Sequence, residues 1–200
     1  MSKIQDMMQY AVEHKVPIMQ QEGMNFLVDF ITENRYHHIL EIGSAIGYSA
    51  IQMALADDEN HVITLERNTE LFQLAQKNIQ EMKLDHRICV LNVDAYEYQI
   101  DQQFDFIFID AAKSQYHGFF EKYYPYLKAG GACFFDNMEF HGLVRSPNAT
   151  QNRNTKQLIR KIKEFREFIE ENEELKSEYY EDVGDGILIV YGKEKGHGIY

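Results

Sequence analysis

Three oxygen-bearing side chains, Asp110, Asp136 and Asn137, each follow an apolar run that has the character of a buried strand, FDFIFI at 104–109 and GGACFF at 130–135. Carboxyl ends of parallel strands meet at one edge of a sheet, so we expect these side chains to converge. Two carboxylates and an amide, without a neighbouring Cys or His, suit a hard cation such as Mg²⁺. The alternative is two strand-end acids and a turn asparagine that bind nothing.

Lys113 lies three residues beyond Asp110, in the segment DAAKSQY. A nearby divalent cation disfavours the ammonium form of a lysine, whereas neighbouring carboxylates favour it. A neutral Lys113 could take the proton from an acceptor hydroxyl, which makes it a candidate general base. Without the metal, a surface lysine paired with an acid is the better interpretation.

A second candidate site surrounds the glycine turn in LEIGSAIGYSA at 40–50. Gly43 and Gly47 permit a tight turn between a strand and a helix, but Ala45 breaks the Gly-x-Gly-x-x-Gly pattern of dinucleotide sites. Glu41, two residues before the turn, suits a ligand with an ammonium group. S-adenosylmethionine combines such a group with a nucleoside. Close packing of helix against strand explains the Gly-x-x-x-Gly spacing equally well.

Acids at the ends of the next two strands extend this candidate site. Glu66 lies 19 positions after Gly47, about where an acid would bind the hydroxyls of a ribose; a solvated glutamate is the alternative. Asp94 and Ala95 could bind an adenine amino group. Asp94 could equally cap a following helix.

A basic segment follows the last of these strands. Between positions 145 and 163 there are six basic residues and no acid, whereas nine acids follow between 164 and 182. We expect phosphate contacts from Arg145, Arg153, Lys156 and Arg160, with a solvated helix face as the alternative. Phosphate contacts would favour tRNA or a CoA thioester over an uncharged catechol as the acceptor.

Hydrophobic periodicity predicts the elements that must position these residues. We expect a doubly wound, mostly parallel seven-stranded α/β sheet, with five βα units, a terminal antiparallel hairpin and added N-terminal helices. We also expect a single domain over residues 1–200, with N-terminal helices in 1–34 and the core in 37–193. The predicted strands end near 42, 67, 94, 110, 137, 183 and 192, and the predicted helices are 3–14, 24–34, 48–56, 69–82, 119–124 and 155–172.

The composition excludes several other classes of protein. A net charge of −12 argues against indiscriminate nucleic-acid binding. No apolar run approaches the roughly 20 residues of a membrane span, and the N-terminus lacks a signal-peptide pattern. We expect Cys89 and Cys133 to be buried strand thiols, as in a cytoplasmic protein that does not bind a membrane.

Taken together, the motifs identify a family resemblance. The chain resembles the class I S-adenosylmethionine-dependent O-methyltransferases of the catechol and caffeoyl-CoA group from about Ile18 to Lys193. Within the group it is most similar to the bacterial tRNA 5-hydroxyuridine methyltransferases, which share Gln-x-Glu-Gly-Met at 20–24 and a basic segment after the DN strand. The motifs that carry the resemblance are LEIGSAIGYSA, LER at 65–67, FIFIDAAKSQY at 106–116, FFDN at 134–137 and VGDGI at 183–187.

The resemblance implies S-adenosylmethionine and Mg²⁺ as cofactors and assigns roles to particular residues. Lys113 would be the catalytic base, with Asp110 close to the methyl donor, and the family is commonly a homodimer. Val93 departs from the glycine that the family often has before its Asp-Ala pair. The implied metal ligands are Asp110, Asp136 and Asn137, and the implied cofactor contacts are Met19, Glu41, Gly43, Gly47, Ser49, Glu66, Asp94, Ala95 and Asp110.

These observations lead to an expected reaction. Both a catechol and 5-hydroxyuracil offer a metal two oxygens on adjacent carbons. The basic segment and the resemblance favour methyl transfer to the 5-hydroxyl of 5-hydroxyuridine at the wobble position 34 of tRNA, giving 5-methoxyuridine. The alternative is a catechol or caffeoyl-CoA type acceptor. A non-catalytic nucleotide-binding domain is less favoured, because Lys113, Asp110 and Asp136 are all present.

Overall fold

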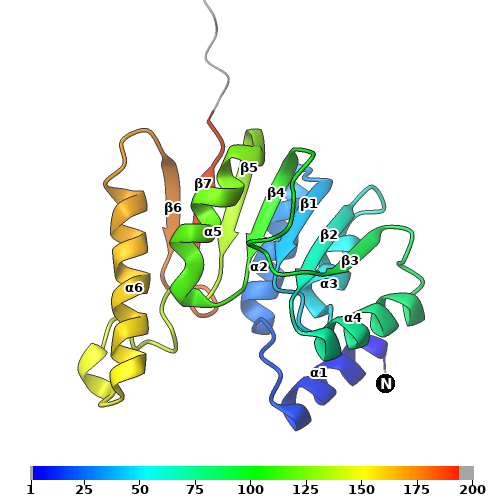
Figure 1. The fold of residues 1–200 in the computed structure, drawn as a ribbon, viewed down its shortest axis with the longest axis horizontal. Helices are drawn as coiled ribbons and strands as arrows, with labels where there is room; N and C mark the ends of the chain where they lie inside the picture. The colour runs from blue at the N-terminus through cyan, green and yellow to red at the C-terminus, as the bar shows by residue number, and fades with distance from the viewer. Residues whose placement is uncertain (1, 194–200) are drawn as a thin grey trace, which may run out of the picture.

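A seven-stranded sheet with the order β3-β2-β1-β4-β5-β7-β6 runs through the centre of the computed structural model, which describes residues 2–193 (Figure 1). Within these residues β7 alone runs antiparallel to its neighbours. The predicted fold class is confirmed, whereas the ends of the predicted 1–200 domain lie outside the described residues. The strands are β1 (His38–Ile42), β2 (His61–Glu66), β3 (Ile88–Asn92), β4 (Phe104–Ile109), β5 (Leu127–Phe135), β6 (Lys176–Tyr180) and β7 (Ile187–Tyr191).

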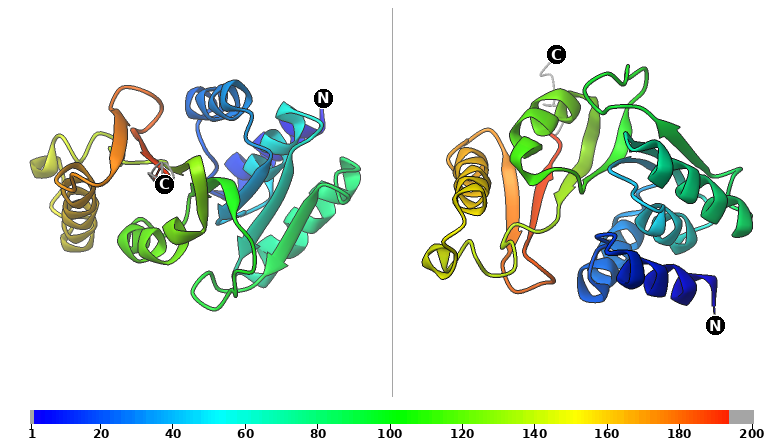
Figure 2. Two further views of the ribbon diagram at one scale, coloured as in Figure 1. Left: turned by 90° about the horizontal axis from the view of Figure 1, so that it is seen from above. Right: turned by 60° about the horizontal axis from the view of Figure 1, so that its bottom comes forward.

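Helices cover both faces of the sheet. Figure 2 shows α2 and α6 on opposite sides of it. One hydrophobic core contains the buried residues of the first four helices, and the other contains those of the last two. The helices are α1 (Lys3–His14), α2 (Gln21–Asn34), α3 (Tyr48–Ala56), α4 (Thr69–Glu81), α5 (Tyr116–Tyr123) and α6 (Arg153–Glu170).

Strand β4 explains why the central strands are apolar on both faces. Phe106 and Phe108 belong to the core beneath α2 and α3, whereas Ile107 and Ile109 belong to the core beneath α5 and α6. All four side chains are fully buried. A parallel strand covered on both sides therefore reads as one continuous apolar run.

Capping residues set helix boundaries that differ from the predicted ones. Helix α4 is capped by Asn68, whose side chain accepts hydrogen bonds from the amides of Glu70 and Leu71, and it ends at Glu81 rather than 82. Asn152 caps α6 in the same way, so α6 begins at Arg153 rather than Thr155. Helix α2 begins at Gln21, three residues before the predicted start at 24.

The expectation of five βα units is wrong at one position, because no helix connects β3 to β4. The ammonium of Lys122, on α5, instead donates to the carbonyls of Ala95, Tyr96 and Tyr98 at 2.7–2.9 Å. Backbone carbonyls satisfied in this way need no helical partners. Asp94 accordingly caps no helix, and its side chain accepts the Tyr96 amide at 2.8 Å within a turn.

Two expectations drawn from composition can be compared with the structure. Cys133 is buried in β5, but Cys89 is exposed, because β3 is an edge strand; the prediction of two buried thiols is wrong for Cys89. Across residues 2–193, no helix combines the length and the apolar character that crossing a membrane requires.

Candidate active site

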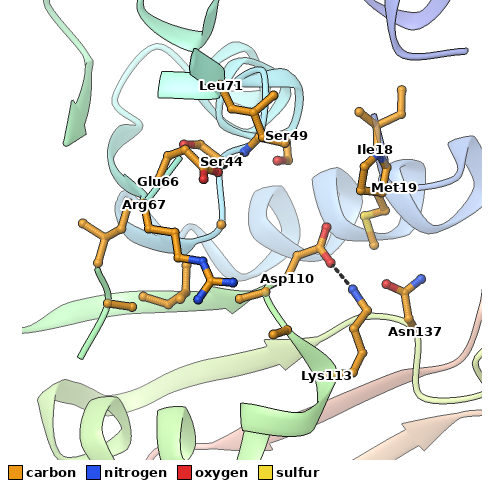
Figure 3. Close-up of a pocket in the computed structure, with 18 of the residues that line it drawn as sticks. Ile18, Met19, Ser44, Ser49, Glu66, Arg67, Leu71, Asp110, Lys113 and Asn137 are labelled. Atoms are coloured by element: carbon orange, nitrogen blue, oxygen red, sulfur yellow. Dashed lines mark hydrogen bonds and ion pairs between the residues drawn. The ribbon is translucent and has the colours of Figure 1, made fainter. Parts of the chain in front are cut away.

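A cavity of about 580 Å³ opens where the carboxyl ends of the parallel strands meet (Figure 3). Its walls are the segments that follow β1 to β5, together with residues 17–20 between α1 and α2. This volume is within the usual range for small-molecule sites. The sheet edge predicted to carry the chemistry therefore holds a cavity of suitable size.

The glycine turn has two functions. Gly43 lines the cavity at φ +99°, and a Cβ there would lie 2.5 Å from the carbonyl oxygen of Asp110. Only glycine allows the ends of β1 and β4 to come this close. Gly47 instead caps α3, and a Cβ there would lie 3.2 Å from the Cβ of Ala75. Gly47 does not line the cavity, so its part of the motif serves packing, the alternative we had considered.

Glu66 is not a solvated glutamate. It is nearly buried, lines the cavity and accepts the backbone amides of Ala45 and Asn68 at 2.9 and 2.8 Å. Ala45 has a φ of +45°, so the carboxylate stabilises a sharp turn. A carboxylate has further lone pairs available for ligand hydroxyls, so the ribose role stays a prediction.

Glu41 lies beneath the cavity rather than in its wall. The carboxylate is fully buried, and the hydroxyls of Ser49 and Thr64 donate to its two oxygens. Burial raises the pKa of Glu41 to about 7, although the two hydroxyl donors lower it. Glu41 is not among the residues that line the cavity, and the direct cofactor contact expected from it stays a prediction. Ser49 does line the cavity, and Glu41 orients its hydroxyl.

The predicted metal ligands and the predicted base lie together at the other end of the cavity. Asp110, Lys113 and Asn137 line the wall, and the Lys113 ammonium lies 2.8 Å from Oδ1 of Asp110 (Figure 3). Asp136 is buried and does not line the cavity, and the Tyr116 hydroxyl donates to its backbone carbonyl at 2.7 Å. Burial and the charge of Asp110 raise the pKa of the Asp136 carboxyl.

This donor set fits a hard divalent cation. No three His, Cys, Asp or Glu side chains form a metal-binding group within residues 2–193, and the predicted ligand set offers two carboxylates and one amide. Mg²⁺ commonly uses few protein ligands of this kind and keeps other positions for water or substrate. A cation here would also offset the repulsion between Asp110 and Asp136.

The other predicted contacts divide into two groups. Met19, Asp94 and Ala95 line the cavity, in agreement with their predicted location. The four predicted phosphate ligands do not line it. Arg145 pairs with Glu139, Asp182 and Glu181 at 3.0, 3.1 and 3.4 Å. These carboxylates occupy its guanidinium, which counts against the phosphate contact we expected from this residue.

Sequence reasoning gave no role to three further residues. Arg67 and Phe140 line the cavity, and each directly follows or closely follows a strand end, which was a usable signal. Asp185 lies in the VGDGI motif, and its carboxylate contacts Asn137 and the backbone of His141. Its position between two glycines was the available indication.

Fold and site together define a class of protein. A three-layer α/β fold with a glycine turn after β1, an acid at the end of β2 and a cavity at the carboxyl edge is the class I methyltransferase arrangement. The O-methyltransferase family matches residues 2–193, and the chain belongs to that family.

Individual relatives agree with this assignment. The chain is 32% identical to a solved structure described as "a putative caffeoyl-CoA O-methyltransferase from Staphylococcus aureus", with a TM-score of 0.90 over 96% of this chain and 93% of the other. An O-methyltransferase from Bacillus cereus, solved in complex with SAH, is 25% identical, with a TM-score of 0.81 over 96% and 91% of the two chains.

Curated protein sequences with caffeoyl-CoA O-methyltransferase names match a shorter part of this chain. "Probable caffeoyl-CoA O-methyltransferase 2" of Dictyostelium discoideum is 32% identical over 69% of this chain and 63% of its own length. The chain spans 58% to 64% of the lengths of this and two further curated relatives.

Proposed function

We propose that this protein transfers a methyl group from S-adenosylmethionine to a hydroxyl of an acceptor that carries a second oxygen on the adjacent carbon. One observation carries the proposal. The cavity has Glu66 on one side, where a nucleoside would bind, and Asp110, Lys113 and Asn137 on the other, where proton transfer would occur. A site of this composition can hold a methyl donor and an acceptor next to each other.

On the donor side, Glu66 would accept hydrogen bonds from the ribose hydroxyls, and Asp94 with Ala95 would contact the adenine. Ser49, backed by the buried Glu41, would bind the polar end of the methionine moiety. Met19 is 5% exposed and lines the cavity from the segment between α1 and α2, so it would cover the bound cofactor.

On the acceptor side, Asp110, Asp136 and Asn137 would hold a Mg²⁺, which when bound lowers the pKa of the acceptor hydroxyl. Lys113 in its neutral amine form would accept the proton from that hydroxyl and become the ammonium. Asp110 orients the lysine through its 2.8 Å ion pair. Most of the acceleration would come from holding the hydroxyl oxygen in line with the sulfonium methyl group.

A small catechol or a caffeoyl-CoA type ester is the acceptor that the relatives favour. Their names point to this type, and the cavity of about 580 Å³ is large enough for a small aromatic ring beside a nucleoside. This type of acceptor is the alternative that the sequence predicts. The names of the relatives support it better than the tRNA acceptor.

One observation keeps 5-hydroxyuridine in tRNA as a second candidate. Helix α6 connects β5 to β6, and both strands run in the same direction, so its N-terminal end lies at the carboxyl edge of the sheet, where the cavity opens. Arg153, Lys156 and Arg160 are exposed along that end. An exposed basic surface at the same edge of the sheet suits an anionic acceptor, either tRNA or the phosphates of a CoA ester.

Transfer of labelled methyl from S-adenosylmethionine separates these candidates. We expect caffeoyl-CoA to be methylated in the presence of Mg²⁺ and the activity to disappear with EDTA. Methylation of hydroxyuridine-containing tRNA, and not of the ester, would establish the second candidate. Binding of S-adenosylmethionine without transfer to either acceptor would contradict the proposed acceptor class, and absence of binding would contradict the proposed function.

The basic end of α6 is tested by reversing two of its charges. If it binds acceptor phosphates, Arg153→Glu with Lys156→Glu should raise KM for the anionic acceptor and leave the affinity for S-adenosylmethionine unchanged. Activity should also fall steeply with added salt. Lys77→Glu, toward the C-terminal end of α4, is the control for reversing a charge away from this surface. An unchanged KM in the double variant would show that this surface is a solvated helix face that does not bind the acceptor.

A further inference from the structure

Asp185 is a buried carboxylate to which the proposed reaction gives no role. It lies in the turn between β6 and β7 and is 6% exposed. One oxygen accepts the backbone amide of His141 at 2.6 Å, and the other accepts Nδ2 of Asn137 at 3.3 Å. The carboxylate therefore contacts both a proposed metal ligand and the loop that forms one wall of the cavity.

The backbone holds Asp185 in this position. The amides of Met138 and Glu139 donate to the carbonyls of Gly186 and Asp185 at 2.9 and 2.8 Å. Gly186 has a φ of +81°, and a Cβ there would lie 2.8 Å from the Glu139 nitrogen. The turn and the segment after β5 are thus locked together, and the Asp185 side chain has a fixed place beside Asn137.

The contact with Asn137 has a directional consequence. The two ends of an asparagine amide have nearly the same shape, but one only donates hydrogen bonds and the other only accepts them. An ionised carboxylate only accepts, so the amide nitrogen of Asn137 must face Asp185. Its oxygen, the end that a cation requires, is then left for the metal. Asn137 has a φ of +59°, so its backbone also adopts a conformation that needs support.

We propose that Asp185 is a positioning residue that selects which end of the Asn137 amide faces the cation. This inference rests on the proposed function, because it presupposes a cation bound by Asp110, Asp136 and Asn137. Partners that orient the ligands of a metal contribute to its affinity, and losing one typically costs 10- to 100-fold. The bond to His141 fixes the same loop from its other side.

Asp185→Asn is the direct test, because it changes one atom and keeps the shape. The His141 amide requires the remaining oxygen, so the new nitrogen faces Asn137 and attracts the amide oxygen away from the cation. We expect Mn²⁺, followed by the electron paramagnetic resonance signal of the free ion, to bind roughly 10- to 100-fold more weakly, with little change in Tm. Asp182→Asn, in the same turn but with an 88% exposed side chain, should bind Mn²⁺ like the wild type.

Exchanging the two groups provides a rescue that a purely structural role would not show. In the double variant Asn137→Asp with Asp185→Asn, the amide at 185 donates to one oxygen of the carboxylate at 137, and the other oxygen stays available to the cation. The net charge is unchanged. We expect Mn²⁺ affinity to return to within a few-fold of the wild type, and this variant decides the matter even if Asp185→Asn folds poorly.

The outcomes separate the positioning role from the proposed function. Wild-type Mn²⁺ affinity in Asp185→Asn would overturn the positioning role alone. A folded double variant that binds as weakly as Asp185→Asn would do the same. If the wild type binds no Mn²⁺, the metal-assisted function fails, and the role of Asp185 fails with it.

Discussion

Replacing Glu41 with Gln tests whether the buried carboxylate beneath the cavity destabilises the protein. The same substitution tests whether Glu41 supports cofactor binding by orienting Ser49. Burial raises the pKa of Glu41 from its ordinary 4.5 to about 7, because the charged form has lost its contact with water, and the hydroxyls of Ser49 and Thr64 offset only part of this. Gln has the same shape and no charge, so the variant removes the penalty while keeping the packing.

The size of the effect follows from the pKa. Between pH 4.5 and about 7, the folded protein keeps a proton on Glu41 that the unfolded chain has lost. The free energy of unfolding of the wild type therefore falls as the pH rises through this window, at up to about 1.4 kcal/mol per pH unit. The total is about 3 kcal/mol, and it applies without a screening discount because the side chain is fully buried.

Urea unfolding of both proteins at pH 4.5 and pH 8, without metal or cofactor, measures this quantity. Other titrating groups, including Asp136, are present in both proteins, so the difference between them isolates Glu41. The free energy of unfolding of Glu41→Gln, relative to that of the wild type, should be about 3 kcal/mol higher at pH 8 than at pH 4.5. S-adenosylmethionine should bind more weakly to the variant, because Ser49 loses its carboxylate acceptor. A stability difference that does not change with pH would refute the argument from burial.

Three further substitutions test the other parts of the site. Lys113→Ala should lower the single-turnover rate roughly 10²-fold or more and leave the affinity for S-adenosylmethionine unchanged; a near-normal rate at neutral pH would leave Lys113 with only its ion pair to Asp110. Glu66→Ala should weaken S-adenosylmethionine binding in calorimetry by about 1–3 kcal/mol, and it should also lower stability, because two backbone amides lose their acceptor. An unchanged affinity would limit Glu66 to supporting the turn. Gly43→Ala should lower the free energy of unfolding by at least about 2 kcal/mol, because the new Cβ meets the Asp110 carbonyl at φ +99°; a wild-type Tm would contradict that close approach.

The sequence by itself determined the order of the elements and the edge of the sheet that carries the site. Apolar runs without alternation, such as 104–109, identified central parallel strands, and such strands place their carboxyl ends at one edge. Asp110 and Asn137 follow strand ends, Glu66 is the last residue of β2, and all three line the cavity as that rule predicts. Hydrophobic periodicity is a property of short segments, so it can be read locally.

Only the tertiary structure decided which of these side chains face the cavity and which partners they have. Glu41 accepts a hydrogen bond from Thr64, on the neighbouring strand, and Arg145 pairs with the acids at 139, 181 and 182. Asp185 contacts Asn137 across 48 residues. Hydrogen bonds and charges act over a few ångströms in space, whatever the separation along the chain, so the pattern of residue types could indicate these groups but not pair them.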